Sequence, residues 1–348
     1  MRDAFLEYFM ERLKKGGVAM FGRKKVVPLQ RLVEMLEASG KRRIVLCDAY
    51  VADIESTDGA IVTDYGFALR VPAGEIVIVD HHAPQKRFKR IVTATELAVR
   101  YFKKYGPADD DTLVVVNHSD TDSVLAVAIV CGILDYTDNP RRWEKMFVEA
   151  ANAADFNGTM NDIADLLQAC EQMEDLGYSV ANLRRIMNGA KIGLSAEKIM
   201  NDRRADREKV RVAVGHGIFR TYGRVCYAFL DRDFNVDPVL WFSFLPGAAA
   251  IVFFVPHPRI CADGGRVRLI ARMGIGPAGV GRIAFDELDL REFDPAWKGK
   301  WNAGSDYYEG TNLDPKIYVR NLNAKIEESL YMETHCPQIL VGDKKMFR

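Results

Sequence analysis

The sequence has 348 residues, 48% of them hydrophobic, and its 48 Lys and Arg residues are balanced by 48 Asp and Glu residues. This length exceeds what one ordinary hydrophobic core contains and predicts two domains. The composition is that of a soluble globular protein, and the zero net charge disfavours long nucleic acid as a partner, because proteins that track it usually carry a basic excess.

No stretch approaches the roughly 20 apolar residues of a membrane span, and the charged start over 1–21 does not resemble a signal peptide. The six cysteines are scattered, without paired spacing. Three of them, Cys47, Cys131 and Cys226, lie in apolar runs, which predicts buried thiols in a reducing compartment and no structural zinc site. These features predict a cytoplasmic protein without a membrane partner, and they leave a homodimer open.

Strand and helix patterns alternate through the first half of the sequence, and apolar runs with little alternation predict strands that are buried on both faces of a sheet. In chain order, the expected elements are helices over 2–15 and 29–38, strands over 41–48, 65–71 and 75–80, a helix over 95–104, a strand over 111–117, a helix over 123–134 and several helices over 140–193. This alternation predicts an α/β fold with a doubly wound parallel sheet.

The second half begins with a highly charged segment over 195–210, whose capping start favours a linker helix. Strands are expected after it, over 210–214, 225–230, 249–255 and 266–273, and they predict a smaller α/β domain. The expected organisation is therefore a first domain over 1–194, a linker helix over 195–210 and a second domain over 211–348.

Two clusters of acidic residues and histidines follow apolar runs. Asp80, His81 and His82 come directly after the run over 76–79, and the segment Asn-His-Ser-Asp-Thr-Asp-Ser over 117–123 follows the run over 113–116. Open α/β sheets bind their ligands at the carboxyl ends of the strands, which is where both clusters are expected. A single Asp after a strand is usually a turn or N-cap residue. Two adjacent histidines at a buried strand end are harder to explain in this way, because a core would have to provide hydrogen-bond partners for both imidazoles.

Carboxylates and imidazoles gathered at one sheet edge would repel one another or change protonation unless a cation held them. Oxygen-rich ligands with a minority of imidazole suit Mn²⁺ or Mg²⁺, although other divalent ions accept them. The clusters contain more ligands than one ion needs. The sequence therefore predicts a centre of two ions that share a carboxylate and activate a water for attack on phosphorus.

The two clusters resemble motifs of the DHH phosphoesterase superfamily. Asp80-His81-His82 resembles the motif that names it, and the segment over 118–122 resembles its HxDxD motif. The strand ending in Asp48 and the segment ending in Asp155 resemble two further motifs, and the segment over 93–97 resembles the helix start that often follows DHH. The order differs from the usual one, because here HxDxD comes after DHH. Spatial convergence, and not chain order, defines such a site.

This resemblance implies a set of metal ligands and a catalytic role for His82 and Asp80. The implied ligands are His118, Asp120, Asp122, Asp48, Asp80, His81 and Asp155. Asp48 or Asp80 would bridge the two ions, and His82 would face the phosphate, where an imidazole stabilises developing charge. The basic run over 86–90 is either a solvated loop or a phosphate contact.

The second half resembles the DHHA1 domain, in which an Arg-bearing strand is followed by a helix and a glycine-rich loop that holds the substrate. The strand over 267–272 and the segment over 281–285 match the strand and the helix, and the segment over 301–305 takes the place of the loop. The resemblance implies that Arg272, Asn302, Gly304 and Ser305 bind substrate. An ordinary glycine-rich turn is the alternative for the segment over 301–305, and His216 and His257 are interpreted as packing or surface residues.

Together these features predict a Mn²⁺-dependent phosphoesterase that hydrolyses phosphodiester bonds in short oligonucleotides or in linear or cyclic dinucleotides. Three alternatives stay open. They are a phosphomonoesterase or pyrophosphatase acting on a small phosphate compound, a RecJ-like single-strand exonuclease, and a nucleotide-binding protein without turnover.

Overall fold

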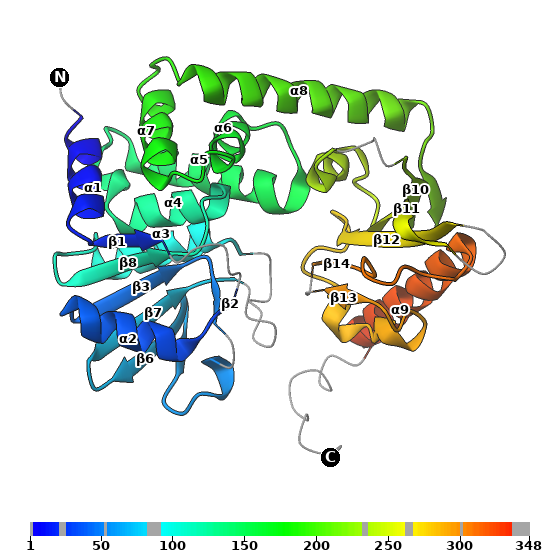
Figure 1. Cartoon of the computed structure of the whole chain (residues 1–348), viewed down its shortest axis with the longest axis horizontal. Helices are drawn as coiled ribbons and strands as arrows, with labels where there is room; N and C mark the ends of the chain where they lie inside the picture. Colours follow the sequence, from blue (N-terminus) through cyan, green and yellow to red (C-terminus); the bar gives the residue numbers. More distant parts are fainter. Residues whose placement is uncertain are drawn as a thin grey trace. The chain divides into compact units, whose positions relative to one another are not determined.

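The computed structural model describes residues 3–20, 26–51, 54–81, 92–231, 236–261, 267–299 and 302–335. The chain divides into two compact units, which Figure 1 colours along the sequence. The first unit contains Met1–Asp155 and Thr159–Ala205, and the second contains Phe156–Gly158 and Asp206–Arg348. The helix α8 (Leu194–Gly215) covers the segment where the linker helix is expected, and the division falls within it.

A six-stranded, mainly parallel sheet forms the centre of the first unit. Its strands, in spatial order, are β1 (Val18–Met20), β8 (Thr112–Val116), β3 (Arg43–Cys47), β7 (Gly74–Val79), β6 (Gly66–Val71) and β5 (Ile61–Thr63). The first four are parallel, whereas β6 and β5 are antiparallel to their neighbours. Only Pro72 and Ala73 separate β6 from β7, so the chain must reverse there. The predicted α/β class is confirmed, with an antiparallel edge added to the parallel core.

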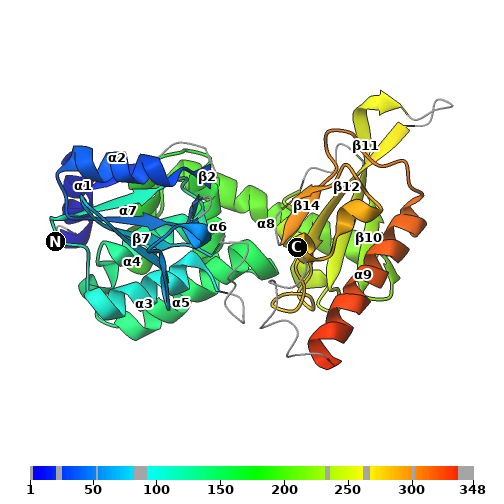
Figure 2. The ribbon, with the colours of Figure 1, turned by 90° about the horizontal axis from the view of Figure 1, so that it is seen from below.

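Helices cover both faces of this sheet (Figure 2). On one face, α2 (Leu29–Ser39) packs against alternate residues of the strands, among them Ile44, Ile76 and Leu113. The opposite face is covered by α1 (Ala4–Lys14), α3 (Ala94–Tyr105), α4 (Thr121–Val130), α5 (Pro140–Asn152), α6 (Asp162–Glu171) and α7 (Leu176–Met187). A small parallel pair, β2 (Val26–Val27) and β4 (Tyr50–Val51), completes the unit.

The register of the parallel strands brings three strand ends together. Cys47, the last residue of β3, pairs with Val79 at the end of β7 and with Val116 at the end of β8. Because β3 lies between β7 and β8, the residues that follow all three strands meet at one edge of the sheet. The unusual order of the motifs in the chain is therefore no obstacle to their convergence.

The second unit is built on a mixed six-stranded sheet. Its strands, in spatial order, are β13 (Lys298–Gly299), β14 (Ala303–Ser305), β12 (Val267–Ile275), β11 (Ala250–Cys261), β10 (Val225–Phe229) and β9 (Arg220–Tyr222). Only the pair β10–β11 is parallel. The helix α9 (Pro315–His335) packs on one face, and the 3₁₀-helix η4 (Pro238–Phe244) packs on the other.

Two predictions for this half of the chain are wrong. The segment over 210–214, predicted as a strand, is part of α8, where Arg211 and Glu208 form an ion pair at 2.5 Å across one helical turn. The segment over 281–285, predicted as a helix, is a turn that leads into a short 3₁₀-helix. Gly281 has a φ of 73°, a left-handed conformation that interrupts a helix.

The predicted buried thiols are confirmed for Cys47, Cys131 and Cys226, which are free and buried, as is Cys170. Among the helices in the described part of the chain, none combines the length and the apolarity that crossing a bilayer requires.

A pair of buried carboxyl groups lies beneath the sheet of the second unit. Asp306 is fully buried and Asp294 is 2% exposed. The Asp306 Oδ1 atom accepts a hydrogen bond from the Ala271 N–H at 2.7 Å, and the Tyr318 hydroxyl donates to Asp294 Oδ2 at 2.7 Å. Burial, and then the charge of Asp294, raises the pKa of Asp306 to about 7.

We expect the second unit to lose stability as the pH rises from 5 to 8. The folded state raises the Asp306 pKa above the unfolded value of about 3.9, so the contribution of this group is complete below that value and is lost as the pH passes about 7. Between pH 5 and pH 7 the loss is at most roughly 3 kcal/mol, at about 1.4 kcal/mol per pH unit. Urea unfolding followed by tryptophan fluorescence should give a lower midpoint at pH 8 than at pH 5.

Asp306→Asn, which carries no charge at either pH, should flatten this dependence. Asp202→Asn, at an exposed position on α8, is the control and should keep the wild-type slope. An unchanged slope in Asp306→Asn would contradict the assignment.

Candidate metal centre

Asp48 lies at the centre of the edge where the three strand ends meet. It follows β3, is 1% exposed and has a φ of 50°, a left-handed conformation that Asp tolerates better than most residues. Its backbone N–H donates to the Val79 carbonyl at 2.9 Å, and its Oδ2 atom accepts a hydrogen bond from the Ser123 hydroxyl at 2.7 Å. The backbone of Asp48 is thus held by β7, and its carboxylate is held by α4.

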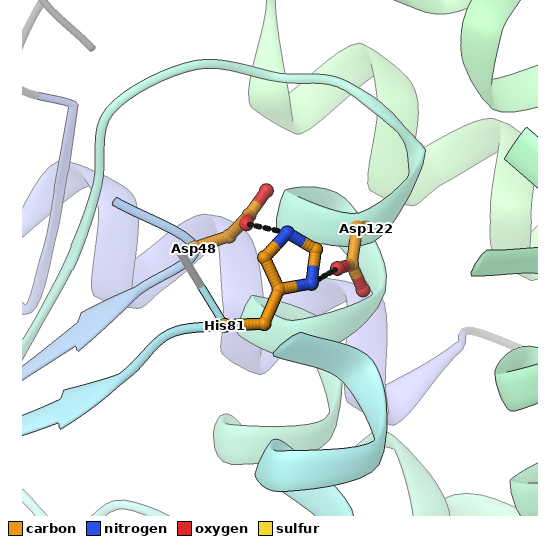
Figure 3. A group of neighbouring side chains, drawn as sticks. All are labelled: Asp48, His81 and Asp122. Atoms are coloured by element: carbon orange, nitrogen blue, oxygen red, sulfur yellow. Dashed lines mark ion pairs between the residues drawn. The ribbon is translucent and has the colours of Figure 1, made fainter. Parts of the chain in front are cut away.

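His81 lies between Asp48 and Asp122 (Figure 3). Its Nδ1 atom is 3.0 Å from the Val92 carbonyl oxygen, which can only accept, so this nitrogen carries the hydrogen. Its Nε2 atom lies 3.8 Å from Asp48 Oδ1. In the neutral ring, the lone pair on Nε2 therefore faces Asp48 and is suited to bind a cation.

Asp122 joins the beginnings of two helices. It lies in the first turn of α4 and accepts three hydrogen bonds from the start of α3: from the Ala94 N–H at 2.7 Å, from the Thr95 N–H at 2.7 Å and from the Thr95 hydroxyl at 2.6 Å. The carboxylate is completely buried, and burial raises its pKa to about 6. Its Oδ2 atom is 3.6 Å from His81 Nδ1, so Asp122 also faces the protonated side of that ring.

His118 and Asp120 form the other side of the site. The His118 Nε2 atom is 2.6 Å from Asp120 Oδ2 and 3.6 Å from Asp48 Oδ2. Burial alone would lower the His118 pKa, but the hydrogen bond and charge of Asp120 raise it to about 9. Burial would raise the pKa of Asp120, but His118 holds it well below its usual value. Asp120 also accepts a hydrogen bond from the Ser123 N–H at 2.9 Å as the N-cap of α4.

Five of the seven implied ligands converge in two groups that share Asp48. One group contains Asp48, His81 and Asp122, and the other contains Asp48, His118 and Asp120; within each, one ligand atom per residue lies within 4.8 Å of the others. Such groups of carboxylates and imidazoles can hold divalent cations.

Asp80 and Asp155 belong to neither group. Asp80 is 3% exposed and directly follows β7, and Asp155 is half-buried in a π-helical turn over Ala153–Asn157. Their roles as ligands remain predictions. His82 and the basic run over 86–90 lie outside the described residues.

The motifs did not reveal which residues position the ligands. Thr95 and Ser123 each donate a hydrogen bond to a ligand carboxylate, and the Val92 carbonyl orients His81. Thr95 belongs to the predicted helix start and Ser123 ends the second cluster, so both lie in segments that the sequence motifs identify. Their partners lie 27 and 75 residues away in the chain, however, and no local pattern indicates such pairings.

In the second unit, the implied substrate residues are neighbours but do not form a loop. Residues Ala303–Ser305 are the strand β14, which pairs with β12 so that Ser305 lies opposite Arg272. The Asn302 carbonyl accepts a hydrogen bond from the Ile275 N–H at 2.8 Å. A Cβ atom on Gly304 would lie 2.6 Å from the Trp297 ring, so this glycine serves close packing. Substrate binding by these residues remains a prediction.

No family model and no curated protein matches the sequence. Among solved structures, the chain is similar to the pGpG-specific phosphodiesterase PggH of Vibrio cholerae, with 11% identity, a TM-score of 0.39, and coverage of 83% of this chain and 99% of that one. It is also similar to an exopolyphosphatase-related protein of Bacteroides fragilis, with 11% identity, a TM-score of 0.37, and coverage of 96% and 98%. These likenesses concern the arrangement of the chain and leave activity and substrate open.

We expect Asp122→Ala to lower the free energy of unfolding of the first unit by about 2–4 kcal/mol, because it leaves three donors at the start of α3 without their acceptor. Asp175→Ala, which removes one N-cap acceptor at the start of α7 in the same unit, should cost only about 1 kcal/mol. Chemical denaturation of the metal-free variants measures both values. Equal losses would show that Asp122 does not have the structural role assigned to it.

Proposed function

We propose that this protein is a metal-dependent phosphoesterase that hydrolyses phosphodiester bonds in short oligonucleotides or in linear or cyclic dinucleotides. The observation that carries the proposal is one buried carboxylate, Asp48, that is shared by two groups of histidine and aspartate at the carboxyl ends of adjacent parallel strands.

The donor set fits divalent cations. It contains carboxylate oxygens and imidazole nitrogens without a thiolate, as suits Mn²⁺ or Mg²⁺. One ion would be held by Asp48 and His81 Nε2, and the other by Asp48, His118 and Asp120. Asp80 and Asp155 remain candidates to complete the two sets. When bound, two such ions would activate a water for attack on phosphorus and neutralise charge on the phosphate oxygens.

The remaining contacts keep these donors in place. The Val92 carbonyl holds the hydrogen of His81 on Nδ1, and Asp122 faces the same nitrogen, so that Nε2 stays available toward Asp48. We therefore assign Asp122 a positioning role in addition to its predicted role as a ligand. This arrangement corresponds to the carboxylate–histidine pairs that orient metal ligands in other proteins. The role of His82 toward the phosphate rests on the resemblance alone.

We expect Asp48→Asn to reduce phosphodiesterase activity with Mn²⁺ by more than ~100-fold, since even outer partners of metal ligands contribute 10–100-fold. The amide keeps an oxygen that can accept the Ser123 hydrogen bond, so the unfolding midpoint of the metal-free protein should change little. Mn²⁺ bound per chain, measured by equilibrium dialysis, should fall in parallel.

Asp138→Asn, at an exposed position of the same unit, is the matched control. Full activity and full Mn²⁺ binding in Asp48→Asn would exclude this metal centre.

Substrate length provides an independent test. The chain has no net charge, and binding of a long strand requires an extended basic groove and weakens steeply with salt. We expect faster initial hydrolysis of a dinucleotide than of a twenty-nucleotide single strand at equal Mn²⁺. Faster cleavage of the long strand would instead favour a RecJ-like exonuclease, and release of phosphate from pyrophosphate alone would favour the pyrophosphatase alternative.

A further inference from the structure

The second unit contains a pocket of about 340 Å³, which we call the Tyr307 pocket. This volume lies within the range of small-molecule sites, roughly 300–1,000 Å³. The pocket is lined by Leu230, Asp231, Val236, Asp237, Pro238, Trp241, Phe253, Val255, Pro256, Pro258, Ile270, Arg272 and Tyr307. All of these residues belong to the second unit, so the pocket is complete without the metal centre.

The register of the sheet explains why the pocket wall is apolar. Phe253 pairs with Arg272 and Val255 pairs with Ile270 across β11 and β12, which places these four side chains on one face of the sheet. The core beneath α9 uses the intervening residues on the opposite face. Arg272 is thus a cation in an otherwise hydrophobic row.

Tyr307 gives the pocket a flat aromatic side. The Arg272 guanidinium lies 5.9 Å from the centre of its ring, and the side chain is 49% exposed, which leaves ring surface for a further planar group. Its backbone is fixed, because His257 Nε2 lies 3.2 Å from the Tyr307 carbonyl oxygen. The preceding residue, Asp306, binds the Ala271 N–H on β12. The backbone that carries the ring is therefore held in place before a ligand arrives.

The charges in the pocket indicate what it accepts. Among the described residues that line the pocket, Arg272 is the one cation, whereas Asp231 and Asp237 are acidic. Asp237 Oδ1 accepts a hydrogen bond from the Val239 N–H at 3.0 Å as the cap of η4, and Asp231 is exposed just beyond the end of β10. A chain of phosphates would meet more negative than positive charge from these described side chains. A neutral planar ring that presents hydrogen-bond donors fits these groups.

We propose that the Tyr307 pocket binds a nucleobase of the substrate, which stacks on Tyr307 beside Arg272 and presents its donor edge to Asp231. Guanine satisfies a carboxylate best, because its ring N–H and its amino group are adjacent donors, whereas adenine presents one amino group beside an acceptor. This inference rests on the proposed function, since it names the part of a nucleotide substrate that the second unit recognises.

The test is calorimetric titration of the full chain in EDTA with GMP, AMP and ribose 5-phosphate. We expect GMP to bind at least ~10-fold more tightly than ribose 5-phosphate, which lacks a base, and more tightly than AMP. Tyr307→Ala should weaken GMP binding by about 10-fold or more, as loss of a stacking partner does elsewhere. Asp231→Asn should remove the preference for GMP over AMP.

Tyr222→Ala is the matched control, because Tyr222 is an exposed tyrosine on β9 of the same unit and does not line the pocket. It should leave GMP binding unchanged. Equal binding of GMP and ribose 5-phosphate, or equal effects of Tyr307→Ala and Tyr222→Ala, would overturn the base pocket. Equal binding of GMP and AMP would overturn the role of Asp231.

The outcome is separable from that of the proposed function, because these titrations contain no metal and measure no turnover. Base-dependent binding without Mn²⁺-dependent hydrolysis would retain the pocket and reject the phosphoesterase. Hydrolysis without base-dependent binding would do the reverse.

Discussion

The first unit depends on the burial of several carboxylates at one edge of a parallel sheet. Asp48 and Asp122 are at most 1% exposed, and Asp120 lies beside them. Charges at this depth cost several kcal/mol each unless hydrogen bonds and opposite charges surround them. Each carboxylate accepts at least one hydrogen bond from a helix start or a nearby hydroxyl, and two histidines lie between them. The same requirement explains why two helices begin at this edge and why a cation fits there.

Convergence at this edge follows from strand pairing. β3 lies between β7 and β8, so residues that are 30 to 70 positions apart in the chain meet after their strands end. The strand that each motif follows therefore predicts the position of its residues in the site better than the order of the motifs in the chain does. The convergence of Asp48, His81 and His118 on one edge of the sheet follows from this pairing.

The sequence predicted secondary structure best where burial on both faces of the sheet alone determined the residue types. The central strands β3, β7 and β8 are apolar on both faces. Their apolar runs predicted all three strands, and also that the polar residues after them lie at the strand ends. It was misleading over 210–214, where a valine-rich pattern is compatible with a strand or a helix and the charged neighbours decide for α8. It was silent about Thr95 as a partner of Asp122, because that hydrogen bond joins two helix starts that only the folded sheet brings together.

The two units pose different problems for interpreting mutations. In the candidate metal centre, Asp122 accepts three hydrogen bonds that hold α3, so loss of activity in an alanine variant there does not distinguish a lost ligand from a displaced helix. Asp48 accepts a hydrogen bond from the Ser123 hydroxyl, and asparagine can keep that bond while it removes the charge. In the Tyr307 pocket the corresponding distinction comes from two exposed tyrosines of the same unit, Tyr307, which lines the cavity, and Tyr222, which does not. In the first unit, the isosteric change Asp48→Asn therefore separates an effect on catalysis from an effect on folding. In the second unit, the comparison of two tyrosine variants separates an effect on ligand binding from an effect on folding.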